Sequence, residues 1–198
     1  MNQLIKFVEK YIDLEEDERI LIANALTVKK YAPNEFILAN KKICKAILFV
    51  ISGSARSVFV NGEGQEYTWS FYFNDEDSTF DNYFIFDFNS FLQQTPTPLT
   101  FQAITEIEAI ELHYEKLQKL LRQFPKMQEL MRIMAEQCYQ VSHKKAFTLL
   151  TLSAKERYLN LLRETPYLLN KFQHYLIASH LGIAPQSLSR LRAEISRR

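Results

Sequence analysis

The chain has 198 residues, of which 47% are hydrophobic and 13% aromatic, and this composition can supply a substantial buried core. No apolar run reaches the length of a membrane span, and the two cysteines, Cys44 and Cys138, cannot form a four-thiolate iron–sulfur site or a disulfide framework. We therefore expect a cytoplasmic protein with no membrane contact, no metal and no cofactor.

The net charge of +1 conceals a division of charge along the chain. Residues 1–115 hold 9 basic and 18 acidic side chains, whereas residues 116–198 hold 15 basic and 5 acidic ones. This asymmetry favours an acidic domain joined to a nucleic-acid-binding one.

The first 115 residues predict two short helices followed by a β domain. Apolar residues recur at the helical period over residues 3–26. Beyond them we expect strands at 35–38, 46–51, 55–60, 65–73, 100–104 and 109–112. Asn61-Gly62 is a strong hairpin signal, and the near-regular spacing of the strands indicates an antiparallel roll or sandwich.

An aromatic segment interrupts the predicted strands at residues 80–98, with six aromatic side chains among its first twelve residues. Such a segment must be mostly buried or line a cavity. The candidate ligand-binding residues here are Phe86, Phe88, Phe91 and Thr97. A purely structural role for the rings is at least as well supported.

Residues 116–148 return to a helical period. A short helix over 116–124 ends at Pro125, which suits the first turn of the next helix. The positions that follow alternate by four and three residues, as in a coiled-coil seam: Met127, Met131, Met134, Cys138 and Val141. This stripe could dock on its own domain or pair with its twin in a dimer. A capping box at Ser153 to Glu156 then predicts another helix, which ends before Pro166.

Residues 174–192 have the spacing of two short helices about a turn, which is the pattern of a helix-turn-helix. Gly182 stands where a chain leaving a helix needs a positive φ, and Ala184 or Pro185 begins the second helix. The apolar positions that would hold the two helices together are Ile177, Leu181, Ile183, Leu188 and Leu191.

The outward face of the second helix predicts contacts with DNA. It carries Gln186, Ser187, Ser189, Arg190 and Arg192. The Arg190 fork matches the O6 and N7 atoms of guanine, and Gln186 suits adenine or a water-bridged contact. The expected phosphate partners are Lys171, Arg192, Arg197 and Arg198.

The stretch LIASHLGIAPQSLSRLR, residues 176–192, resembles the C-terminal motif of CRP/FNR-type transcriptional regulators, particularly of the shorter members. Glu156-Arg157-Tyr158 resembles a second segment of that family, and the order of the predicted strands is similar to its cyclic-nucleotide-binding roll. The resemblance implies an α+β protein with a jelly-roll-like antiparallel β-roll over 1–115, a linker and dimerisation helix over 116–150, and an all-α (winged) helix-turn-helix domain over 151–198. It also implies a homodimer through residues 126–148 that binds a pseudo-palindromic site in double-stranded DNA.

The sensor part departs from the family pattern. The family's Gly-Glu pair would fall at Asp87-Phe88 and its phosphate-binding arginine at Thr97, and neither matches. No lysine or arginine lies between Arg56 and Lys116, so a cyclic phosphate would find no local cation. We therefore expect an unknown effector, or none, in place of a cyclic nucleotide.

Two classes of function remain. No nucleophile motif, phosphate loop, dinucleotide fingerprint or metal-ligand spacing is present, so we do not expect an enzyme. The first class is a dimeric transcriptional regulator of the CRP/FNR type. The alternative is a dimeric small-molecule or protein-binding module with a pocket in the roll and weak or no specific DNA binding.

Overall fold

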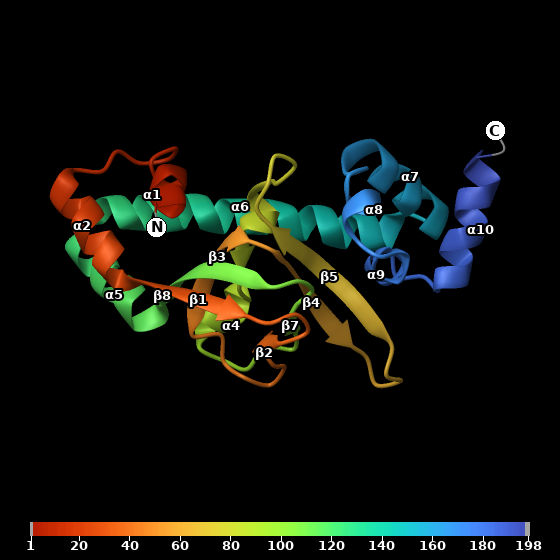
Figure 1. Ribbon diagram of the computed structural model, residues 1–198, viewed down its shortest axis with the longest axis horizontal. Helices are drawn as coiled ribbons and strands as arrows, with labels where there is room; N and C mark the ends of the chain where they lie inside the picture. Colours follow the sequence, from red (N-terminus) through yellow and green to blue (C-terminus); the bar gives the residue numbers. More distant parts are fainter. Residues whose placement is uncertain (1, 197–198) are drawn as a thin grey trace.

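The first half of the chain folds into two antiparallel sheets that face each other in a β-roll, as the computed structural model of residues 2–196 shows (Figure 1). One four-stranded sheet has the order β1-β8-β3-β6, and the other has the order β2-β7-β4-β5. Strand β5 is therefore an edge strand. The elements of this part are α1 (Asn2–Val8), α2 (Glu16–Ala25), β1 (Leu26–Tyr31), β2 (Phe36–Leu38), β3 (Ala46–Ser52), β4 (Ser54–Val60), β5 (Glu66–Phe73), α3 (Phe80–Tyr83), β6 (Phe84–Ile85), α4 (Phe88–Gln93), β7 (Thr100–Ala103) and β8 (Ile107–His113).

The predicted fold class is confirmed, and the six predicted strands are present with bounds shifted by a residue or two. The sequence pattern did not reveal β1 or β6. Strand β1 carries two exposed lysines instead of a clean apolar alternation. Lys29 and Lys30 lie 3.8 and 3.7 Å from Glu111 and Glu108 on β8, respectively. Strand β6 has only two residues and lies inside the aromatic segment.

A glycine is required at the turn between β3 and β4. Gly53 has φ +84°, and a Cβ atom there would lie 1.9 Å from the carbonyl oxygen of Glu106. The left-handed conformation and the close backbone both exclude a side chain at this turn. This close approach also fixes the β7–β8 connection against the turn.

Helix α6 (Pro125–Thr151) follows α5 (Tyr114–Gln123) and runs along the molecule from the roll to the C-terminal helices (Figure 1). Met127 and Met134 are only 3% and 6% exposed, and they pack in the same core as α1 and α2, with Met131 partly buried beside them. The methionine stripe thus docks on its own domain. These methionines are not available to a second copy of the chain.

The C-terminal part is helical, with α7 (Ala154–Glu164), α8 (Leu168–Lys171), α9 (His174–His180) and α10 (Pro185–Ser196). The capping box at Ser153 and Glu156 opens α7 as predicted. Between His113 and Ser196 the structure contains no β-strand, so the described residues form no wing. The core of this part also includes Phe71 and Phe73 of β5, which places the helices directly against the roll.

Candidate nucleic-acid interface

The turn between α9 and α10 has the hydrogen bonds of a Schellman motif. Gly182 adopts φ +66°, and its N–H donates to the carbonyl of Ser179 at 3.1 Å. The N–H of Ile183 donates to the carbonyl of Ala178 at 3.0 Å. These two bonds satisfy carbonyls that the end of α9 would otherwise leave open, and they set the angle at which α10 departs.

Arg157 on α7 forms hydrogen bonds with the backbone at the same turn. Its Nε donates to the carbonyl of Leu181 at 3.1 Å, and its Nη1 donates to the carbonyl of Leu152 at 2.7 Å. The guanidinium therefore ties the helix-turn-helix to the end of α6. Leu188 is 0% exposed and Ile177 1% exposed, so the predicted apolar positions do hold the two helices together.

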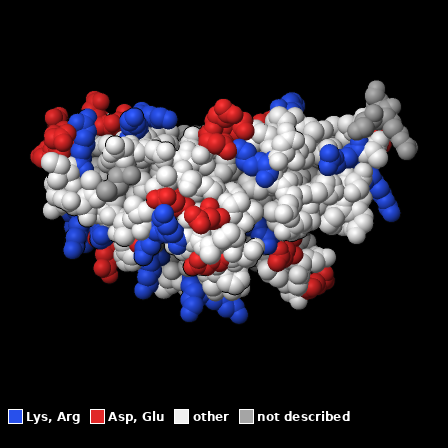
Figure 2. All heavy atoms as spheres, in the orientation of Figure 1, with Lys and Arg blue, Asp and Glu red and all other residues white. Residues whose placement is uncertain are grey.

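The side chains predicted to contact DNA lie together on the exposed face of α10. The side chains of Gln186, Ser187, Arg190 and Arg192 are exposed and form no hydrogen bond or ion pair with any residue between 2 and 196. The Ser189 hydroxyl donates to the carbonyl of Pro185 at 3.2 Å. Figure 2 shows blue spheres and few red ones over this end of the molecule. Arg197 and Arg198 lie outside the described residues.

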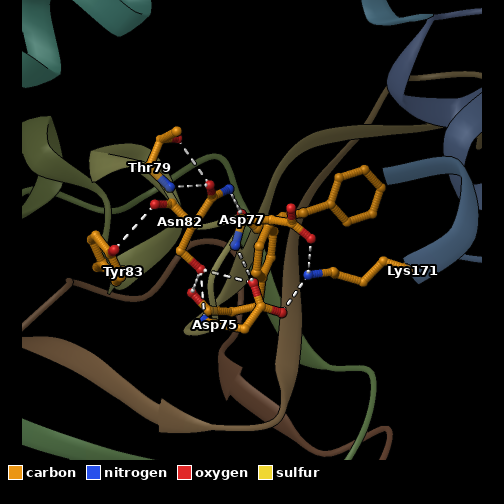
Figure 3. A network of polar contacts seen from close by, with 9 residues as sticks. Asp75, Asp77, Thr79, Asn82, Tyr83 and Lys171 are labelled. Atoms are coloured by element: carbon orange, nitrogen blue, oxygen red, sulfur yellow. Dashed lines mark hydrogen bonds and ion pairs between the residues drawn. The ribbon is translucent and has the colours of Figure 1, made fainter. Parts of the chain in front are cut away.

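Lys171 is placed differently from the other predicted DNA contacts. Its ammonium group forms ion pairs with Asp75 and, at 3.3 Å, with Asp77, both in the loop after β5 (Figure 3). It also lies 4.3 Å from the ring centroid of Phe73. In this conformation the Lys171 ammonium group is paired with carboxylates of the roll and is not available to a DNA phosphate.

Helix α9 covers the free edge of β5 through Ser179. The Ser179 hydroxyl accepts from the backbone N–H of Thr68 at 2.9 Å and from its hydroxyl at 3.1 Å, and donates to the carbonyl of Glu66 at 2.8 Å. An edge strand presents unpaired backbone groups, and one serine satisfies two of them here.

Two basic side chains meet beside that edge. His180 binds the carbonyl of Thr68 at 3.0 Å through Nδ1, and Lys145 on α6 donates to the Ser70 hydroxyl at 2.9 Å. Burial, and then the charge of Lys145, lowers the pKa of His180 to about 4. Burial also lowers the pKa of Lys145 to about 8. His180 is therefore neutral at pH 7, and it must donate through Nδ1–H because a carbonyl only accepts.

Aromatic packing completes the contact between the two parts. Phe172 stacks on Phe71 of β5 with ring centroids 4.1 Å apart and an interplanar angle of 16°. It also lies 5.8 Å from the ring of Phe73. Phe172 is 5% exposed, so the core of the helical part continues into the sheet without a solvent layer.

The aromatic segment builds a short helix whose N-terminus is occupied by a carboxylate of the chain itself. Asp87 caps α4, accepting from the N–H of Ser90 at 3.1 Å, and its second oxygen accepts from the hydroxyl of Thr97. Thr97 is 1% exposed and also accepts from the N–H of Leu99 at 3.0 Å. The capping role of Asp87 was not predicted from the sequence, although aspartate is among the preferred N-cap residues.

Tyr72 occupies part of the interior of the roll. Tyr72 points inward from β5, and its hydroxyl lies 3.0 Å from that of Ser57, which is 0% exposed. Burial raises the pKa of Tyr72 far above its ordinary value, so the phenol remains neutral. Its ring lies 5.9 Å from that of Phe101 on β7, which lies beyond β4 in the same sheet.

The predicted ligand-binding rings contact one another, since Phe86 lies 5.8 Å from Phe88 and 6.1 Å from Phe91, but they do not line one cavity together. Phe91 is 0% exposed and packs in the core against Tyr114, at a ring distance of 5.3 Å. Phe88 packs against Phe86, at 5.8 Å. Only Phe86 lines a cavity in the roll, while Thr97 belongs to the Asp87 cap. Phe91 therefore has the purely structural role that the sequence analysis kept as an alternative to ligand binding.

Residues 28–124 match the family of cyclic nucleotide-binding domains. No curated protein sequence gives a significant match to the chain. The fold is similar to that of FixK2 from Bradyrhizobium japonicum, with a TM-score of 0.71, 17% identity, and coverage of 87% of this chain and 85% of FixK2.

Two further solved structures are similar over most of their length. The c-di-GMP-responsive global regulator CLP of Xanthomonas campestris gives a TM-score of 0.70 at 15% identity, with 92% of each chain covered. A protein of Eubacterium rectale described as a transcriptional regulator of the CRP/FNR family gives 0.70 at 18% identity, with 95% of this chain and 88% of that chain covered. At these identities the likeness establishes the fold.

The described part of the chain, residues 2–196, contains no helix long and apolar enough to cross a membrane. Within the same residues, histidine, cysteine and carboxylate side chains form no cluster of three that could hold a metal ion.

Proposed function

We propose that this chain, which contains a cyclic nucleotide-binding domain and has the fold of CRP/FNR-type transcriptional regulators, is itself a DNA-binding transcriptional regulator and not an enzyme. The observation that carries the proposal is the exposed face of α10, where Gln186, Ser187 and Arg190 stand unpaired on a rigidly held helix. We assign residues 1–115 to the sensor roll, 116–150 to the linker and dimerisation helix, and 151–198 to DNA binding.

In this proposal α10 enters the major groove by its N-terminal end, as helix-turn-helix proteins do. Arg190 reads a guanine through its two parallel N–H donors, and Gln186 contacts adenine directly or through water. Arg192 binds phosphate and carries no base information. Lys171 reaches phosphate only after its ion pairs with Asp75 and Asp77 have opened.

A mobility-shift titration with random-sequence duplex DNA at rising salt tests the proposal. We expect retardation that weakens as salt increases, because released counterions drive phosphate binding. Arg192→Ala should weaken retardation, whereas Arg122→Ala, on the exposed surface of α5 at the other end of the molecule, should not. Absence of any shift at low salt would favour a binding module without DNA affinity.

We further propose that the protein is a homodimer through α6, but on a different face from the buried methionines. Tyr139, Phe147 and Leu150 are 70%, 61% and 86% exposed, and the exposed His143 lies between them at helical spacing. Three large apolar side chains on one exposed stripe favour a partner surface. A two-fold axis along this stripe would place two α10 helices at successive major grooves about 34 Å apart, on a pseudo-palindromic site.

We do not assign a cyclic nucleotide as the effector. The capping carboxylate of Asp87 occupies the start of α4, and Tyr72 fills the neighbouring interior of the roll. Both features oppose an incoming cyclic phosphate, since Asp87 is negative and the buried Tyr72 ring already occupies part of the interior. Isothermal calorimetry with cyclic AMP and cyclic GMP should show no saturable heat, and micromolar binding of either would overturn this part of the proposal.

A further inference from the structure

A cavity of about 240 Å³ lies between the two sheets of the roll, and it adjoins the segment of the Asp87 cap, since Phe86 and Cys44 are among its lining residues. Its walls include Leu48, Ile85 and Phe101, which are 6%, 1% and 0% exposed. Neither Asp87, Thr97 nor Tyr72 lines it. For comparison, an apolar cavity of about 150 Å³ binds benzene. The space is therefore sufficient for one substituted ring.

One end of the cavity is polar because of the alternation of β8. Ile107 and Ala109 point into the roll and are 0% exposed, so Glu111 and His113, two and four positions beyond Ala109, face the same side. Tyr31 of β1 and Lys45 contribute to the same lining. An apolar core would place aliphatic side chains at these positions.

These polar groups lack hydrogen-bond partners in the described residues. Glu111 has one charged neighbour, Lys29, at 3.8 Å, which is beyond hydrogen-bond distance. The Tyr31 hydroxyl and the His113 ring form no hydrogen bond with any residue from 2 to 196. Burial, and then the charge of Glu111, raises the pKa of Tyr31, so its phenol stays protonated. Partly buried polar groups that converge without partners are suited to a ligand.

We propose that this cavity binds a small molecule with a single aromatic ring, or an apolar body of similar size, and a hydroxyl or amine that donates to Glu111. The apolar walls take the ring, and the carboxylate, phenol and imidazole take the polar head. This inference goes beyond the proposed function, because it concerns the roll alone and stands whether or not the chain binds DNA.

Fluorine NMR on the full chain, without DNA, tests the site. The probes are 4-fluorobenzylamine, 4-fluorobenzyl alcohol and 4-fluorotoluene, which share the ring and differ in the donor. We expect saturable changes in the fluorine signal for the first two probes and weaker binding of the third. Glu111→Gln should weaken the amine about tenfold, the loss of one charged hydrogen bond, and change 4-fluorotoluene less than twofold.

The matched control is Glu108→Gln. Glu108 lies on the same strand as Glu111 but on its opposite face, 3.7 Å from Lys30, and its substitution should leave all three affinities unchanged. Ala46→Phe, at the cavity wall, should abolish binding of every probe, and Leu48→Phe provides a second filling variant if the first fails to fold by circular dichroism. Absence of saturable binding, undiminished binding in a folded filling variant, or equal effects of Glu111→Gln and Glu108→Gln would overturn the proposal.

Discussion

Replacing Ser179 by alanine should weaken the docking of the helical part on the roll, because it removes the polar contacts at the β5 edge while the aromatic contacts of Phe172 with β5 remain. The Ser179 hydroxyl makes three hydrogen bonds to β5, at 2.9, 3.1 and 2.8 Å, and Thr68, which it contacts, is 3% exposed. Each such bond contributes roughly 0.5–1.5 kcal/mol, and the freed backbone groups regain water once the parts separate. The three bonds together therefore correspond to a loss of about 1.5–4.5 kcal/mol of docking free energy, or roughly a 10- to 2,000-fold shift toward the undocked form.

Trp69 reports this separation directly. It is the single tryptophan of the chain, it lies on β5, and its ring is 4.9 Å from the Lys145 ammonium. In Ser179→Ala we expect a changed emission spectrum and an earlier urea transition monitored at Trp69. Ser187→Ala, a serine on the exposed face of α10, should reproduce the parent curve. If Ser179→Ala also reproduces the parent curve and spectrum, the contact at the β5 edge does not hold the two parts together.

Three further predictions concern the exposed Leu150, the ion pairs of Lys171 and the buried His180. Leu150→Asp should leave the fold intact, since Leu150 is 86% exposed, and should yield monomers in light scattering; an unchanged dimer would place the interface elsewhere. Neutralising Asp75 and Asp77 together as asparagines should free Lys171 and steepen the salt dependence of DNA binding by about 0.9 per protomer, and an unchanged slope would show that Lys171 does not reach phosphate. Because the pKa of His180 is lowered to about 4, the unfolded chain binds this proton more readily between pH 6.5 and 4. Stability should therefore fall as the pH drops through that window, by at most about 3 kcal/mol, and a profile equally steep in His180→Gln would contradict the assignment.

The helix-turn-helix could be predicted from the sequence because its determinants are local. Gly182 and Pro185 mark the end of one helix and the start of the next, and the structure has both at those positions. Leu188, predicted as a buried contact, is 0% exposed. Helix ends and apolar spacing are determined by residues close together in the chain, so they can be recognised in the sequence alone.

The docking of α9 on β5 could not be predicted in the same way. Thr68 and Ser179 are 111 positions apart, and nothing in either neighbourhood indicates the other. The methionine stripe shows a related limit. The spacing of the methionines indicates that one face of α6 is apolar. Which residues pack against Met134 depends on where α1 and α2 lie in the fold, and the spacing gives no information on that.

The polar end of the cavity in the roll was also not evident from the sequence. Glu111 follows two inward-facing positions on β8, but its inward placement requires the strand register, in which it lies opposite Leu48 and Thr27. A single alternating acid in a strand otherwise resembles a solvent-exposed residue. The pairing of three strands around it is what turns it into a candidate binding group.

The most direct test of DNA reading by α10 is selection of binding sites from a random duplex library with the parent protein, Arg190→Ala and Arg192→Ala. The parent should enrich a pseudo-palindrome with half-sites about one helical turn apart. Arg190→Ala should lose preference at one base position of each half-site, by about 1–3 kcal/mol, whereas Arg192→Ala should enrich the same sequence with uniformly weaker binding. Enrichment of the parental site by Arg190→Ala with undiminished preference at every position would show that α10 does not read DNA through this face.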